Sequence, residues 1–87
     1  MTIFEILGKK WTLEILKLLT DSDRSFSEIE ELVKNPKTTS DRLKELEELK
    51  IVEREVQQDK QRSVKYRLTE LGKNLVPKIK AIERIFK

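Results

Sequence analysis

The chain has 87 residues, of which 40% are charged and 37% hydrophobic, and its formal charge is +3. This length suits a single domain over residues 1–87 with a modest core, which makes oligomerisation a useful further source of stability. It contains no cysteine and no histidine, which argues against disulfides, thiol sensing, the usual zinc sites and the commonest general base. No apolar run approaches the ~20 residues of a membrane span. We therefore expect a soluble, cytoplasmic protein without metal or cofactor that is not an enzyme.

The first third of the chain predicts three helices. Apolar residues recur at helical spacing in a short first segment and, after Gly8, in a second segment that begins near Trp11. Residues 21–24 are polar and predict a turn. Ser27 is a good N-cap for a brief third helix, whose apolar residues are Ile29, Leu32 and Val33.

Asn35 and Pro36 predict the start of a fourth helix, because asparagine caps well and proline is tolerated at the first helical position. This helix should run to about Lys50. Its inward stripe contains Thr39, Leu43, Leu46 and Leu49, which leaves another side free for contacts.

The last third predicts a β-hairpin followed by a long helix. Residues 51–56 and 64–68 alternate as strands around a polar, charged tip. Thr69 should cap the final helix, in which Pro77 is a candidate kink.

This order of elements predicts a mainly α fold with a small β-hairpin, the winged helix-turn-helix arrangement. In such a fold the helix over residues 36–50 enters the major groove of DNA and the wing at 57–63 lies on the backbone. The charge distribution agrees, since residues 1–33 carry four basic and seven acidic groups, residues 34–67 ten and seven, and residues 68–87 five and two. The later segments are thus the cationic ones.

Five short stretches also resemble the HxlR-type winged-helix transcription regulators, which are relatives of MarR, over residues 7 to about 80. They are Leu7-Gly8-Lys9-Lys10-Trp11-Thr12-Leu13-Glu14-Ile15-Leu16, Ser25-Phe26-Ser27-Glu28-Ile29, Arg42-Leu43-Lys44-Glu45-Leu46-Glu47, Ile51-Val52-Glu53-Arg54-Glu55-Val56 and Tyr66-Arg67-Leu68-Thr69-Glu70-Leu71-Gly72. The resemblance implies a DNA-binding regulator.

The chain departs from the pattern of that family at three places. Lys50 stands where a glycine is usual after the recognition helix, and Thr39 stands where a leucine is common. The cysteine that redox-responding members carry near the N-terminus is absent, so thiol sensing is not expected here.

Candidate DNA contacts lie mainly on the exposed side of the fourth helix and at the wing tip. They are Lys37, Thr38, Ser40, Asp41 and Lys44 on the helix, Lys60 and Arg62 at the tip, and Ser27 and Lys34 on the preceding helix. Arg42 either reaches a phosphate or pairs with Glu45 or Glu28. For Arg54 and Arg67 we expect cross-strand pairing with Glu53 or Glu55.

Hydrophobic residues at both ends of the chain predict a homodimer interface. In the final helix they are Leu75, Ile79, Ile82 and Phe86, with Val76 and Ile85 at the flanks, and in the first helix they are Ile3, Phe4 and Leu7. The alternative is that the final helix folds back on its own domain.

Other conspicuous residues have structural explanations. Trp11 and Tyr66 should be packed. The acidic residues Glu28, Glu30 and Glu31 suit the start of a helix and lack a neighbouring ligand that would complete a metal site.

The function expected is sequence-specific regulation of transcription by a homodimer on double-stranded DNA. An architectural protein with little sequence preference and a protein-docking winged helix remain alternatives. The sequence identifies no operator and no effector.

Overall fold

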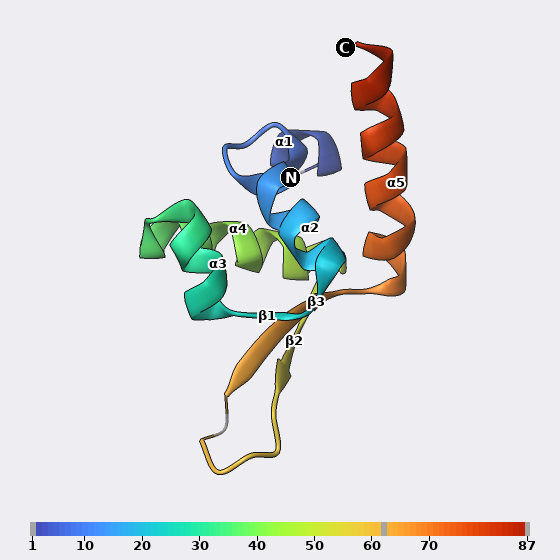
Figure 1. Ribbon diagram of the computed structural model, residues 1–87. Coiled ribbons are helices and arrows are strands. Elements are labelled where there is room, and N and C mark those ends of the chain that lie inside the picture. The colour runs from blue at the N-terminus through green and yellow to red at the C-terminus, as the bar shows by residue number, and fades with distance from the viewer. Residues whose placement is uncertain (1, 62, 87) are drawn as a thin grey trace.

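The computed structural model describes residues 2–61 and 63–86, which form five helices and three strands (Figure 1). In chain order they are α1 (Ile3–Leu7), α2 (Thr12–Asp21), β1 (Arg24–Ser25), α3 (Phe26–Val33), α4 (Pro36–Glu48), β2 (Val52–Val56), β3 (Val64–Leu68) and α5 (Glu70–Ile85). The predicted order of helices and hairpin is confirmed. Strand β1 was not predicted; its first residue, Arg24, falls at the end of the predicted turn over residues 21–24.

Polar caps set where the helices begin. The Asn35 side chain accepts a hydrogen bond from the backbone N–H of Thr38 (3.0 Å), and the Thr69 hydroxyl accepts one from the N–H of Gly72 (3.1 Å). Both predicted caps are confirmed. The predicted cap of α3 is wrong by two residues, because Ser25 and Glu28 form a reciprocal capping box and place Ser27 inside the helix.

The end of α4 keeps the geometry that usually calls for a glycine. The N–H of Ile51 donates to the carbonyl of Leu46 and the N–H of Lys50 to that of Glu47, which is the Schellman arrangement. It requires a left-handed residue, and Lys50 adopts it with φ 63°. Lysine in place of the usual glycine at position 50 therefore keeps the geometry of the turn and raises only its free-energy cost.

The three strands form one antiparallel sheet in the order β1-β3-β2. In the wing, Val52 pairs with Leu68 and Val56 with Val64. Strand β1 joins the other edge of β3, where Arg24 pairs with Tyr66. A two-residue polar strand has no alternating pattern, so it could not be predicted from periodicity.

One hydrophobic core lies between the helices and the root of the wing. Its members are Ile6, Ile15, Leu16, Leu19, Ile29, Val33, Leu43, Leu46, Ile51, Val52, Tyr66, Leu68 and Val76. Thr39 is fully buried beside them, and its hydroxyl donates to the carbonyl of Asn35 at 2.8 Å. The polar atom is thus satisfied at a position where a leucine is common.

Helix α5 stands beside the other helices, and its C-terminal end reaches beyond α1 in the view of Figure 1. It runs without interruption through Pro77. Val76 belongs to the core, and Leu75 and Ile79 pack partly against it. The first half of α5 therefore folds back on its own domain, while the last turns extend past it. Within residues 2–61 and 63–86, no helix combines the length and hydropathy of a membrane span.

Candidate nucleic-acid interface

The outer side of α4 is free of packing. Thr39, Leu43 and Leu46 are buried on the inner side, whereas Lys37, Ser40 and Lys44 are exposed. Because Lys37, Ser40 and Lys44 recur at three and four residues, they lie along one stripe of the helix. Asp41 and Thr38 are half-buried at its margins. The predicted candidates on α4 thus share one accessible side.

The ion pair between Lys37 and Asp41 on this stripe is weak. The Lys37 ammonium lies 3.1 Å from the Asp41 carboxylate one turn on, and the Lys37 side chain is 85% exposed. An exposed pair of this kind contributes only ~0.3–0.5 kcal/mol, so a phosphate can replace it. Lys44 has no ion pair among the residues that the structure describes.

Arg42 makes one of the two ion pairs that the sequence left open. Its guanidinium lies 2.9 Å from a Glu45 oxygen, and the other oxygen of Glu45 lies 2.5 Å from the ammonium of Lys9. The Arg42 and Glu45 side chains are only 15% and 16% exposed. The three groups fasten α4 to the loop between α1 and α2. Lys9 could not be predicted from the sequence, because a contact across 36 residues leaves no local pattern.

Hydrogen bonds to a carboxylate side chain stabilise the turn at the wing tip. The Asp59 carboxylate accepts hydrogen bonds from the Ser63 N–H (3.1 Å) and hydroxyl (2.8 Å). Lys60 is exposed between them at the turn. The predicted contact Arg62 lies outside the described residues.

The predicted pairing of the wing arginines is confirmed for Arg67 only. Its guanidinium lies 2.5 Å from Glu53 and 2.6 Å from Glu55. The hydrogen bond to Glu53 is the main cause that raises the pKa of Arg67. Arg54 stands between the two glutamates in β2, so its side chain lies on the opposite face of the strand. In the described part of the chain it has no ion pair.

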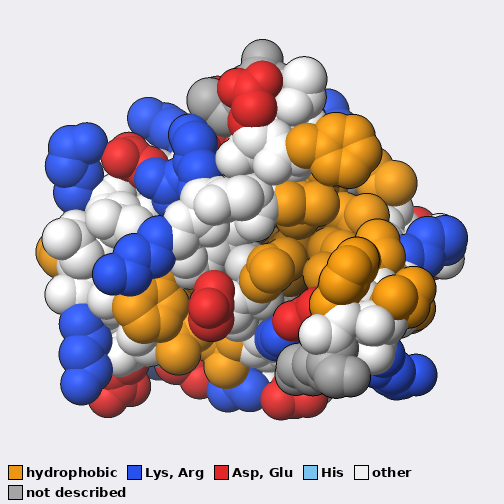
Figure 2. Space-filling view, turned by 90° about the horizontal axis from the view of Figure 1, so that it is seen from above, with side chains coloured by type: hydrophobic (Ala, Val, Ile, Leu, Met, Phe, Trp, Pro, Cys, Tyr) orange, Lys and Arg blue, Asp and Glu red, His pale blue; other side chains and the backbone are white. Residues whose placement is uncertain are grey.

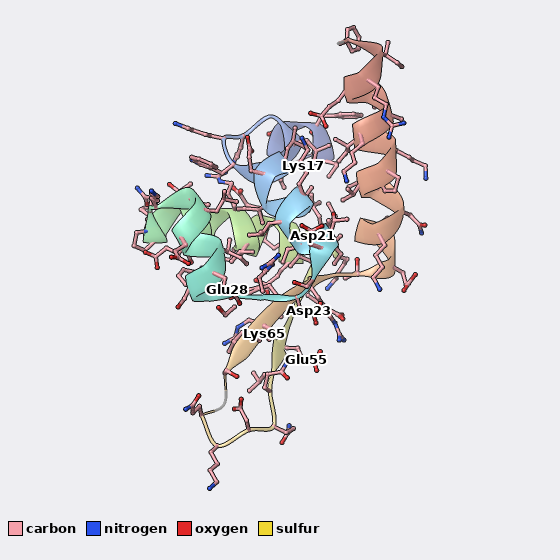
Figure 3. All side chains as sticks on the ribbon, viewed as in Figure 1. Lys17, Asp21, Asp23, Glu28, Glu55 and Lys65 are labelled. Atoms are coloured by element: carbon pink, nitrogen blue, oxygen red, sulfur yellow. The ribbon has the colours of Figure 1, made fainter. Side chains whose placement is uncertain are left out.

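Glu28 joins the start of α3 to the wing. Its carboxylate accepts a hydrogen bond from the Ser25 N–H (2.9 Å) and lies 3.7 Å from Arg24 and 3.6 Å from Lys65 of β3 (Figure 3). The backbone hydrogen bond from Ser25, then its hydroxyl and the two cations, lower the pKa of Glu28. Nearby, Ser27 is exposed on the first turn of α3 and Lys34 is exposed at its end with φ 61°.

A second surface is apolar, in contrast to the polar and charged stripe of α4. Figure 2 shows a continuous hydrophobic area on the side where α1 and the end of α5 lie. Phe4 is 80% exposed, Ile82 58%, Ile85 76% and Phe86 83%. Of the remaining predicted interface residues, Ile3, Leu7, Leu75 and Ile79 are partly buried against the chain's own core.

Charged clusters elsewhere do not suggest a metal centre. Across residues 2–61 and 63–86, no three histidine, cysteine, aspartate or glutamate side chains gather as a metal ion would require. The α4 stripe and the wing tip thus offer exposed cations and hydroxyls, and the second surface is apolar.

Comparisons with known proteins point to one group. The profile of HxlR-like helix-turn-helix proteins matches residues 6–87. The HTH-type transcriptional regulator YodB of Bacillus subtilis is 42% identical over 71 residues, which are 79% of this chain and 63% of YodB. The uncharacterized HTH-type transcriptional regulator YvaP of the same bacterium is 39% identical over 75 residues, 84% of this chain and 69% of YvaP. The chain thus spans less than two thirds of YodB.

Solved structures agree with this grouping. The reduced form of YodB superposes with a TM-score of 0.85 at 37% identity, over 93% of this chain and 81% of that one. A possible HxlR family transcriptional factor from Thermoplasma volcanium gives 0.82 at 26% identity, over 99% and 79%.

Proposed function

This chain belongs to the HxlR-like helix-turn-helix family, and from that premise we propose that it is a transcriptional regulator that binds double-stranded DNA as a homodimer. The relatives compared above are named as regulators of transcription, not as enzymes. One observation carries the proposal. The stripe of α4 that bears a hydroxyl and two lysines is not packed against the rest of the domain, and the neighbouring wing has an exposed lysine at its tip.

In the proposed complex α4 enters the major groove, which is ~12 Å wide and accepts one helix. Thr38 and Ser40 contact base edges, Asp41 accepts from a cytosine amino group, and Lys37 and Lys44 reach guanine or phosphate oxygens. When Lys37 binds DNA, it gives up its ion pair with Asp41. Because that pair is exposed and weak, the protein loses little stability.

The remaining contacts fix the position of α4. Lys60 of the wing and Ser27 and Lys34 of α3 contact phosphates, which set register without reading sequence. Arg42 acts through Glu45, since that pair and Lys9 hold α4 at its angle to the rest of the domain.

The apolar surface supplies the homodimer contact. Phe4, Ile82, Ile85 and Phe86 place large side chains in water at one end of the molecule, which costs solubility unless a partner covers them. A second copy is the simplest cover, because a two-fold axis lets the same patch meet itself. The pair of α4 helices would then reach half-sites about one helical turn apart.

Mobility-shift titration on a duplex selected from a random library tests the proposal. Replacing Lys37 and Lys44 together by alanine should weaken binding at least tenfold with an unchanged melting temperature. The matched control replaces Lys73 and Lys78, which are equally cationic and exposed on α5. Equal losses in both double variants would show attraction by net charge alone, the behaviour of an architectural protein. No binding to any duplex would favour protein docking.

A further inference from the structure

A cleft of about 660 Å³ opens between the end of α2, strand β3 and the side of α5 that runs from Lys73 to Arg84. Its volume lies in the range of sites for small molecules. Leu19, Leu68, Val76 and Pro77 form its apolar floor, so a bound group would touch the edge of the hydrophobic core. None of the predicted DNA contacts lines it.

The two walls of this cleft carry opposite charges. Asp21 and Asp23 stand on the wall formed by the end of α2 and the turn into β1 (Figure 3), and Lys80 and Arg84 stand on α5. Within the described residues, none of these four groups has an ion pair within 4.0 Å.

Two further cations line the cleft. Arg67 pairs with Glu53 and Glu55, and Lys73 lies 3.7 Å from Glu70. Because the Lys73–Glu70 pair is exposed and weak, Lys73 remains available, so the cleft offers a ligand two carboxylates on one side and the cations Lys73, Lys80 and Arg84 on the other.

The cleft and the apolar dimer surface lie on different sides of α5. Lys73, Lys80 and Arg84 are separated by seven and four residues, so they share one side of the helix. Ile82 and Phe86 follow Lys80 and Arg84 by two residues each, which turns them about 200° around the axis. Covering the apolar surface with a second copy thus leaves the cleft open.

We propose that this cleft binds a small zwitterion with an apolar side chain, of the class of the hydrophobic α-amino acids. Its ammonium lies between Asp21 and Asp23, its carboxylate faces Lys80 and Arg84, and its side chain covers the floor. A ligand with only one charge loses the ion pairs to one of the walls, which lowers its affinity. Exposed ion pairs are weak, so the burial of the side chain supplies most of the affinity and the walls supply the selectivity.

Such a ligand would bridge the end of α2 to α5 beside the root of the wing. It would thereby fix the angle of α5, the helix that we assign to the dimer. This consequence rests on the proposed function, whereas binding of the ligand does not.

Calorimetric titration of the full chain without DNA tests the site. The probes are L-phenylalanine, phenethylamine, which lacks the carboxylate, and 3-phenylpropionate, which lacks the ammonium. We expect L-phenylalanine to bind one per chain and each analogue to bind about two- to fivefold more weakly, as the loss of exposed ion pairs predicts.

Charge-neutral variants identify the walls. In Asp21→Asn with Asp23→Asn, the advantage of L-phenylalanine over 3-phenylpropionate should disappear, and in Lys80→Gln with Arg84→Gln its advantage over phenethylamine should disappear. Lys78→Gln on the same helix, which does not line the cleft, is the control and should behave as the parent chain.

Three results would overturn the proposal: no saturable binding of L-phenylalanine, equal binding of either analogue, or wall variants that bind as the parent does. Since the titration contains no DNA, a chain that fails to bind DNA leaves this result intact, and the reverse also holds.

Discussion

Replacing Gly72 by alanine should loosen the attachment of α5. A Cβ at this position would come within 3.0 Å of the carbonyl oxygen of Ile51, closer than real Cβ atoms lie, and 3.1 Å from Cδ2 of Leu68. The Thr69 N–H donates to the same carbonyl at 3.0 Å, and the Thr69 hydroxyl is shared between the carbonyls of Lys50 (2.6 Å) and Ile51 (3.1 Å). Helix α5 cannot move away from Ile51 without breaking these bonds.

The net effect follows from two opposing terms. Alanine favours a helix over glycine by ~1 kcal/mol. Crowding of the new Cβ against a backbone oxygen opposes this gain. Overpacking typically costs ~1–3 kcal/mol, and the cost is expected to reach the upper end of that range or exceed it where the backbone must move. We expect a net loss of about 2 kcal/mol in the free energy of unfolding. For a domain of this size that lowers the melting temperature by roughly 8–16 °C.

Thermal unfolding followed by far-UV circular dichroism measures the change. Asn74→Ala is the matched control, because Asn74 is exposed two residues further along the same helix and should tolerate alanine without loss. A melting temperature of Gly72→Ala equal to or above that of the parent chain would refute the close packing of α5 on Ile51.

Four further perturbations follow from the same structure. Lys50→Gly should raise the free energy of unfolding by about 1 kcal/mol, since glycine adopts φ 63° without the side-chain clash; a loss in chemical denaturation would contradict it. Lys60→Ala should lower the slope of log affinity against log salt by about one on every duplex, and a change in sequence preference would instead mean base reading. Ile82→Asp with Phe86→Asp should give folded monomers in sedimentation; persistent dimers would place the interface elsewhere. Because the pKa of Glu28 is lowered from 4.5, its contribution to stability is present above pH 4.5 and is lost as pH falls through the folded pKa. Glu28→Gln should therefore show a smaller loss of melting temperature on acidification than the parent chain, and equal losses would count against the role of Glu28.

Most of the fold could be predicted from local signals in the sequence. Asn35 and Thr69 are caps whose partners lie three residues away, so both helix starts were predictable. The cap of α3 was misplaced because two serines compete there, and only the pairing of Ser25 with Glu28 decides between them. Strand β1 exists because β3 has a free edge, which depends on tertiary structure alone.

The candidate site was predictable to the extent that it follows helix periodicity. The exposed stripe of α4 came directly from the spacing of its buried residues. Arg42 could not be resolved, because its environment depends on Lys9 from a distant loop. The division of α5 into a packed half and an exposed half was equally hidden, since Leu75 and Ile82 are alike in sequence and differ only in what lies opposite them.

Mapping of the contacts on a selected duplex tests the central claim most directly. Hydroxyl-radical protection combined with interference by methylation of guanine N7 reports both the backbone and the major groove. Two protected half-sites on one face of the duplex, about 34 Å apart, with interference at guanines inside each, are the predicted result for a dimer that inserts two α4 helices. Protection that does not depend on sequence, or no interference at guanine N7 inside the protected half-sites, would contradict it.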